Sequence, residues 1–183
     1  MRNILLCSFI IIHVVIACKN GADKPHHNPV NETEANIYRS ADSMMAAFKR
    51  KDWSTFAQYN HPAMMKMMGG PEAFASFIGE QMKQIPDTAI KKLETGKILQ
   101  VVKTNNDQQC VVEQKMEMHL EGTTISNTTY LIGESLDGGK NWTFFDASTK
   151  AMAPKDIKPD ISSELKIPEK KQEVRGNDGR NAV

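Results

Sequence analysis

Apolar and polar residues alternate from Gln109 to Asp146, the longest such pattern in the chain. Successive side chains of a strand point to opposite faces of a sheet, so this period of two predicts strands with one dry face and one wet face. On the strand from Cys110 to Leu120, the even-numbered positions form the dry face. Glu121-Gly122-Thr123 and Asp137-Gly138-Gly139-Lys140 interrupt the pattern with turn-forming residues. The stretch is therefore predicted to be a three-stranded antiparallel meander.

The residues before the meander are expected to begin the sheet and to cover its apolar face. A further strand is predicted over residues 90–102. Apolar residues at helical spacing predict helices over residues 33–51, 53–59 and 71–85. The short apolar run at residues 63–68 is interpreted as a strand or an extended segment. These elements define an α+β fold.

The length of 183 residues suits one domain with tails. After residue 150 the chain becomes rich in charge and proline and carries no aromatic residue, which is typical of disorder. The predicted organisation is a signal peptide (1–17), a flexible tether (18–32), the domain (33–150), a partly ordered extension (151–168) and a disordered tail (169–183).

The N-terminus has the features of an export signal. Arg2 precedes an apolar stretch over residues 4–16, which is shorter than the roughly 20 residues that span a bilayer. The stretch ends in Val15-Ile16-Ala17-Cys18, which resembles the lipobox of bacterial lipoproteins. The resemblance implies cleavage before Cys18 and lipidation of its thiol, and hence a membrane partner. Lys19 follows where many lipoproteins of the inner membrane carry aspartate, so the expected location is the outer membrane. An ordinary secretory signal with a chance cysteine is the alternative.

Charge and cysteine usage narrow the possible partners. The chain has 23 basic and 22 acidic residues, so electrostatics gives no reason to expect a nucleic-acid partner. Cys110 is the only thiol left after cleavage and lipidation, and it is interpreted as a small buried hydrophobe. Gly-rich phosphate loops and paired cysteines are absent from the sequence, so no cofactor and no metal are expected.

The order of the predicted elements over residues 34–148 resembles the NTF2-like, or SnoaL-like, α+β family. The resemblance implies a curved sheet wrapped around the first helix, with a mouth between them that serves as a ligand pocket, a catalytic pocket or a dimer surface. The motifs that carry it are Asp52-Trp53-Ser54-Thr55-Phe56, Tyr59-Asn60-His61-Pro62, Gly69-Gly70-Pro71-Glu72 and Trp142-Thr143-Phe144-Phe145.

His61 is the catalytic candidate, because it lies at a corner near the expected mouth and could act as a general base. Alternatively, its side chain could hydrogen-bond a neighbouring carbonyl and lock that corner. Methionines near the mouth could form an adaptable apolar pocket or simply fill the core. The residues expected to line a ligand pocket are Trp53, Tyr59, His61, Met64, Met68, Met116, Met118 and Tyr130.

Two further motifs are local. Asp87-Thr88-Ala89 resembles the acceptor of some periplasmic O-glycosylation systems, which implies a glycan on Thr88. Ser135 to Trp142 matches the Asp-box of sialidase-type propellers, where the motif stabilises a turn. One copy cannot build a propeller, so only a hairpin turn is inferred here.

Three functions are compatible with these observations. The first is a non-catalytic envelope lipoprotein that binds a small apolar ligand or a protein partner. The second is a SnoaL-like isomerase or hydrolase that uses His61. The third is a structural subunit that forms a homodimer through its sheet.

Overall fold

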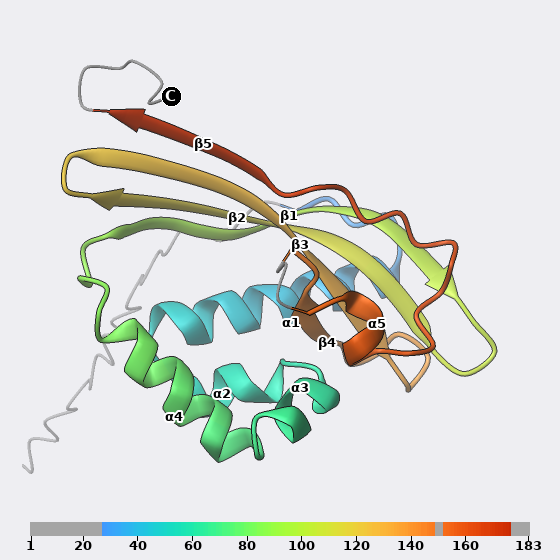
Figure 1. The fold of residues 1–183 in the computed structure, drawn as a ribbon. Helices are drawn as coiled ribbons and strands as arrows, with labels where there is room; N and C mark the ends of the chain where they lie inside the picture. Colours follow the sequence, from blue (N-terminus) through green and yellow to red (C-terminus); the bar gives the residue numbers. More distant parts are fainter. Residues whose placement is uncertain (1–26, 149–151, 177–183) are drawn as a thin grey trace, which may run out of the picture.

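The computed structural model describes residues 27–148 and 152–176. Helices of the N-terminal half pack on an antiparallel sheet that does not close into a barrel, so the predicted α+β class is confirmed (Figure 1). The elements are α1 (Glu32–Lys49), α2 (Trp53–Gln58), α3 (Pro62–Met67), α4 (Pro71–Met82), β1 (Ile90–Lys103), β2 (Gln108–Leu120), β3 (Thr123–Ser135), β4 (Thr143–Asp146), α5 (Pro154–Ile157) and β5 (Lys171–Gly176).

Some sequence predictions fall outside the described residues. These are the signal peptide, the lipobox with Cys18, the tether up to residue 26, residues 149–151 and the tail from residue 177. The end of the predicted tether is described, and its His27 packs against α1 while residues 28–32 are exposed. The His27 ring stacks on Tyr38 of α1 with centroids 3.8 Å apart, and its Nε2 atom lies 3.2 Å from Asp42 Oδ1.

The sheet is built on the predicted meander. Its order is β1-β2-β3-β4, and β5 pairs with β3 along the same edge as β4. Strands β2 and β3 pair without a register shift from Gln108 opposite Ser135 to Leu120 opposite Thr123. The turn between them has positive φ at both Glu121 (47°) and Gly122 (80°), which is the backbone that a tight hairpin requires.

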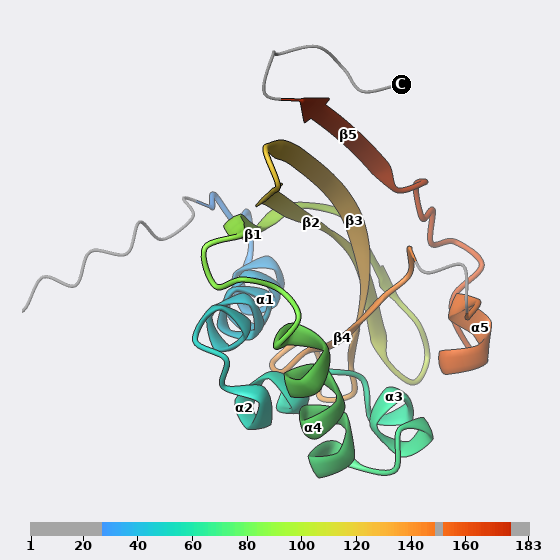
Figure 2. The same ribbon diagram turned by 60° about the vertical axis from the view of Figure 1, so that its left-hand side comes forward.

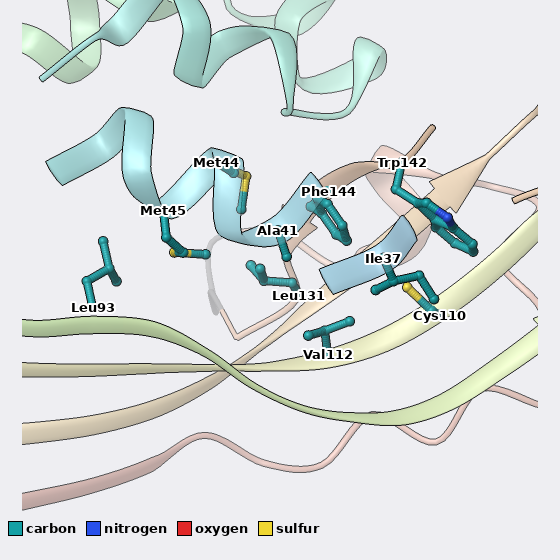
Figure 3. Close-up of a cluster of buried hydrophobic side chains, with 10 residues drawn as sticks. All are labelled: Ile37, Ala41, Met44, Met45, Leu93, Cys110, Val112, Leu131, Trp142 and Phe144. Carbon is teal, nitrogen blue, oxygen red and sulfur yellow. The ribbon is translucent and has the colours of Figure 1, made fainter. Parts of the chain in front are cut away.

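Helix α1 lies against one face of the sheet, and the sheet curves over it (Figure 2). The Asn31 side chain caps the helix by accepting the Glu34 N–H at 2.9 Å. Buried α1 residues spaced three and four apart face the strands. Figure 3 shows the resulting core, which consists of Ile37, Ala41, Met44, Met45, Leu93, Cys110, Val112, Leu131, Trp142 and Phe144.

Gly133 lets two strands and the core pack closely. A Cβ atom at this position would lie 2.5 Å from Cys110 Sγ and 2.8 Å from a Phe144 ring carbon. Cys110 itself is fully buried, as predicted, and burial raises the pKa of its thiol. A neutral thiol in a packed core is a structural residue, not a nucleophile.

The helices after α1 form a second layer with a small core of their own, made by Ala57, Met65 and Phe74. The prediction of a strand or extended segment at residues 63–68 is wrong, because Pro62–Met67 is helix α3. The His61 side chain accepts the Ala63 N–H and Pro62 occupies the first turn, and both features start a helix.

The C-terminal residues cover the other face of the sheet, opposite α1 (Figure 2). Ile157, Ile161 and Leu165 pack there against Ile132 and Phe145. At the start of β2, Gln109 and Val111 are buried in addition to the predicted dry-face positions, and the Gln109 side chain contacts the main chain of Asp160 and Ser162. The prediction of disorder from residue 169 is wrong for residues 171–176, which form β5 against Thr123–Thr128 of β3.

Candidate functional site

An apolar hollow lies where the end of α1, the start of α2, the end of α4 and the start of β1 meet. It has a volume of about 170 Å³. The Phe48 and Trp53 rings meet edge to face in its wall, with centroids 5.3 Å apart. The residues that line it are Phe48, Lys49, Lys51, Trp53, Met82, Ile85, Pro86, Asp87 and Ile90.

A second hollow continues on the other side of Trp53 and Met82, between α2 and α4, with a volume of about 360 Å³. Gly79 makes room for the indole, because a Cβ at this position would lie 3.1 Å from Trp53 Cδ1. The rim is charged: Lys51 pairs with Asp87, and Lys83 Nζ lies 2.6 Å from Glu80 Oε1. We call the two hollows together the Trp53 cleft.

A third hollow, of about 460 Å³, is lined mainly by polar groups. It lies between the residues before α1, α1 itself and the middle of β1, and it includes Tyr38, Thr95, Lys97 and Lys115. Its lining lacks large aliphatic side chains such as the Met82, Ile85 and Ile90 of the Trp53 cleft. It is therefore the poorer match to the apolar pocket predicted from the sequence.

The structure does not bring the predicted pocket residues together. Trp53 lines the cleft, but Tyr59 and Met116 pack on the main core under α1. Met64 and Met68 pack in the small helical core, and Met118 lies on β2 between Ile90 of β1 and Ile125 of β3. Tyr130 is 2% exposed on β3, and His61 lies in the polar network described next.

Charged and polar side chains form a buried network beneath the C-terminal residues, on the face of the sheet opposite α1. His61 Nε2 lies 2.8 Å from Glu134 Oε2, and Lys158 Nζ contacts the other oxygen of Glu134. Lys158 Nζ also lies 2.7 Å from Asp107 Oδ2 and 2.9 Å from Asp160 Oδ1. The Lys158 side chain is 3% exposed. A buried ammonium is therefore held by three carboxylates.

Asp107 is further stabilised by two neutral donors. Gln109 Nε2 lies 3.1 Å and 3.0 Å from its two carboxylate oxygens, and the Thr104 hydroxyl contacts Oδ1. Burial acts to raise the pKa of Asp107, but hydrogen bonds from Lys158, Thr104 and Gln109 outweigh burial and hold the pKa below its ordinary value. Burial likewise acts to lower the pKa of Lys158, and its contacts with Asp107, Glu134 and Asp160 outweigh burial and raise it. Both groups are therefore ionised.

His61 has no ring nitrogen free for catalysis in this arrangement. Its Nδ1 atom accepts the Ala63 N–H at 3.2 Å, so the ring proton lies on Nε2 and is donated to Glu134. The side chain is 8% exposed and packs edge to face on Phe145, with centroids 5.4 Å apart. Its geometry locks the corner between α2 and α3 to β3.

Sequence reasoning identified His61 but missed its partners. Glu134 lies in the alternating stretch, and Lys158 lies in a charged segment beyond the predicted domain. Lys158 is flanked by two apolar residues, Ile157 and Ile161, and these gave the only local signal. Those residues anchor the segment that carries the lysine into the network.

The remaining predicted features are placed as follows. Thr88 is exposed in the turn between α4 and β1. Within residues 27–148 and 152–176, His, Cys, Asp and Glu side chains do not gather in threes or more in a way that would hold a metal ion. None of the described helices is both long and apolar enough to cross a membrane.

Comparison with known proteins adds no relative: no family model matches the chain, and no curated protein matches it either.

Proposed function

We propose that the protein is a membrane-anchored envelope lipoprotein whose NTF2-like domain is non-catalytic and binds a small apolar ligand in the Trp53 cleft. The lipobox-like Val15-Ile16-Ala17-Cys18 supports the anchor, and Lys19 supports the outer membrane. The layout of a curved sheet over a long first helix supports the NTF2-like assignment.

The single observation that carries the ligand proposal is the apolar wall of the cleft. Phe48, Trp53, Ile85 and Ile90 come from four different parts of the chain and meet at a hollow open to the surface. Small-molecule sites are concave and lined mostly by apolar and aromatic side chains, with a few polar groups at the rim. The Lys51–Asp87 ion pair supplies such a rim.

The enzyme alternative has less support. Its catalytic candidate, His61, is in the network and not in the cleft, and both ring nitrogens are engaged. A general base needs a free lone pair within hydrogen-bonding reach of the substrate proton. The pairing of His61 with Glu134 is better explained as a structural contact.

The proposal is tested by titrating the protein with anilinonaphthalene sulfonate, an apolar dye that fluoresces in apolar sites. We expect saturable binding that becomes about tenfold weaker or more in Trp53→Ala, because a large aromatic wall contributes about 1.5–3 kcal/mol of apolar contact. Trp142 is buried, with 2% exposure, so a change in tryptophan emission on binding reports on Trp53.

Phe77→Ala is the matched control, since Phe77 is a 47% exposed aromatic residue of α4 that does not line the cleft. Its dye affinity should equal that of the wild type. Equal dye affinities of Trp53→Ala and wild type, in variants with unchanged circular dichroism, would reject the cleft as the binding site.

A further inference from the structure

The network around Lys158 places a primary amine against a carboxyl group inside the protein. Lys158 Nζ lies 2.7 Å from Asp107 Oδ2, and the Lys158 and Asp107 side chains are 3% and 2% exposed. The oxygen that the amine contacts is bonded directly to the carboxyl carbon, Cγ. Glu134 contacts the same nitrogen through Oε1. A lysine nitrogen, the carboxyl group of Asp107 and a second carboxylate that could carry a proton thus lie together.

We propose that Lys158 and Asp107 condense to an intramolecular amide bond, with Glu134 carrying the proton. The bond would join the C-terminal residues to the turn between β1 and β2. This modification is independent of the ligand proposed for the Trp53 cleft, because the two sites share no residue.

The reaction balances without any added reagent. A proton first passes from Lys158 Nζ to Asp107 Oδ2, which leaves an amine and a carboxylic acid. The amine lone pair then forms a bond to Cγ, and the carbonyl electron pair moves onto Oδ1. The nitrogen next gives a proton to Glu134, which transfers it to Oδ2. The Cγ–Oδ2 bond breaks, the carbonyl re-forms, and one water molecule leaves.

The surrounding side chains suit each of these steps. Gln109 and Thr104 both hydrogen-bond Asp107 Oδ1, the oxygen on which negative charge develops. His61 donates to the far oxygen of Glu134, so it orients that carboxylate and leaves Oε1 toward the amine. Glu134 accepts one proton and later donates one, which is the ordinary role of a general base and acid.

Position and burial favour condensation over hydrolysis. Holding two reactants in contact in one chain replaces a bimolecular collision by an effective concentration far above any in solution. Ile157, beside Lys158 in the chain, and Phe145, against His61, belong to the apolar cluster that covers this region. This apolar cover limits the access of water from one side, while Asp160, which also contacts Lys158 Nζ, is 67% exposed.

The proposal is tested by peptide mass mapping of the full-length protein purified from membranes and digested with trypsin. Trypsin releases residues 104–115 with Asp107 and residues 156–166 with Lys158, because the bond between Lys158 and Pro159 resists cleavage. We expect one branched peptide, lighter by one water molecule than the sum of the two. Separate peptides only, from a folded wild-type protein, would overturn the proposal.

Two variants test the proposed roles of Lys158 and Glu134. Lys158→Arg keeps the positive charge but lacks the amine, so it should give the separate peptides. Glu134→Gln keeps the shape of the carrier but not its basicity, so it should give much less of the branched peptide. Lys155→Arg is the control, because Lys155 is exposed nearby, and it should give the branched peptide like the wild type. Circular dichroism verifies that each variant is folded, and a branched peptide in folded Lys158→Arg would refute the assignment.

Discussion

Asp137 organises the turn between β3 and β4. Its carboxylate accepts hydrogen bonds from the Ser135 hydroxyl, from the Lys140 and Asn141 N–H groups and from the Asn141 amide, at 2.6–3.1 Å. The carbonyl of Gly139 in the same turn accepts the Trp142 indole N–H at 3.1 Å and the Asn36 amide at 2.9 Å. One acidic side chain therefore shapes the hairpin turn that the Asp-box pattern predicted, and the Asn36 contact binds this turn to α1.

The Asp137 turn should make the stability of the protein depend on pH. Hydrogen bonds from Asn141 and Ser135 hold the pKa of Asp137 well below its ordinary value of about 3.9. Because the folded pKa is depressed, the contribution is present above about pH 4 and is lost as the pH falls through the lower folded pKa. Asp137→Asn should therefore lower Tm at pH 7, and its difference from the wild type should shrink on acidification.

The measurement is thermal unfolding of both proteins between pH 7 and pH 2. Asp146→Asn serves as the control, since Asp146 is an exposed carboxylate at the end of β4 that accepts the Ser148 N–H. A Tm difference between Asp137→Asn and wild type that stays constant over this range would contradict the assignment.

At the scale of elements, the C-terminal residues bind the sheet through two glutamine amides. Gln109 donates to the Asp160 carbonyl and accepts the Ser162 N–H, at 3.3 Å and 2.8 Å. Gln100 does the same with the Glu164 carbonyl and the Lys166 N–H, at 2.9 Å and 3.0 Å. Each side-chain amide thus engages the main chain as a neighbouring strand would. The C-terminal residues are held by main-chain contacts as well as by their apolar side chains.

Gln109→Met should loosen this attachment. Methionine has a similar size but cannot hydrogen-bond the Ser162 N–H, and Asp107 also loses a donor. Leaving buried polar groups unsatisfied costs about 1–3 kcal/mol. We expect faster proteolysis after residue 158 and a lower free energy of unfolding, measured by limited digestion and by urea titration.

Gln100→Met is the matched control for Gln109→Met, because Gln100 makes the same pair of contacts at a half-buried position. Its effect should be smaller, since water can replace the lost contacts. An equal or larger effect of Gln100→Met would show that burial does not set the strength of the attachment.

Over the whole molecule, the sequence predicted the correct element wherever that element follows from a local periodicity. The alternation from Gln109 to Asp146 and the apolar stripe of α1 set the meander and its main helix, and both are present. The run from Ala63 to Met68 was wrongly predicted to be extended, since five apolar residues around Lys66 suit a strand or a helix equally. The cap formed by the His61 side chain decided it, and that cap was not visible in the pattern.

The polar network could not be predicted from local sequence patterns, because its members are far apart in the chain. His61 and Glu134 are separated by 73 residues, and Lys158 lies another 24 residues beyond. The extension over residues 151–168 was predicted to be partly ordered, and its residues Ile157, Ile161 and Leu165 pack against Ile132 of β3 and Phe145 of β4. A charged composition suggested disorder from residue 169 onward. Pairing with the edge of β3 outweighs that tendency for residues 171–176.

The proposed membrane anchor leads to a prediction at the scale of the whole molecule. Cys18→Ala should move the protein from the membrane fraction to the soluble fraction, because two or three acyl chains at about 0.8 kcal/mol per buried CH₂ hold a lipoprotein almost irreversibly. Cys7→Ala, within the predicted signal peptide, should leave fractionation unchanged. Immunoblots of separated membranes provide the measurement, and a Cys18→Ala protein that stays with the membranes would argue for another mode of attachment.

Strand β5 covers an edge of the sheet that could otherwise pair with another molecule. Without it, the backbone of β3 from Thr123 to Thr128 would offer a row of unpaired N–H and C=O groups, which is a template for strands of other molecules. β5 fills that row, and its own side chains include an ion pair between Arg175 and Glu173, at 2.6 Å. Charged edge strands resist the addition of a further strand. β5 thus occupies the part of the β3 edge to which a strand of another copy could otherwise add.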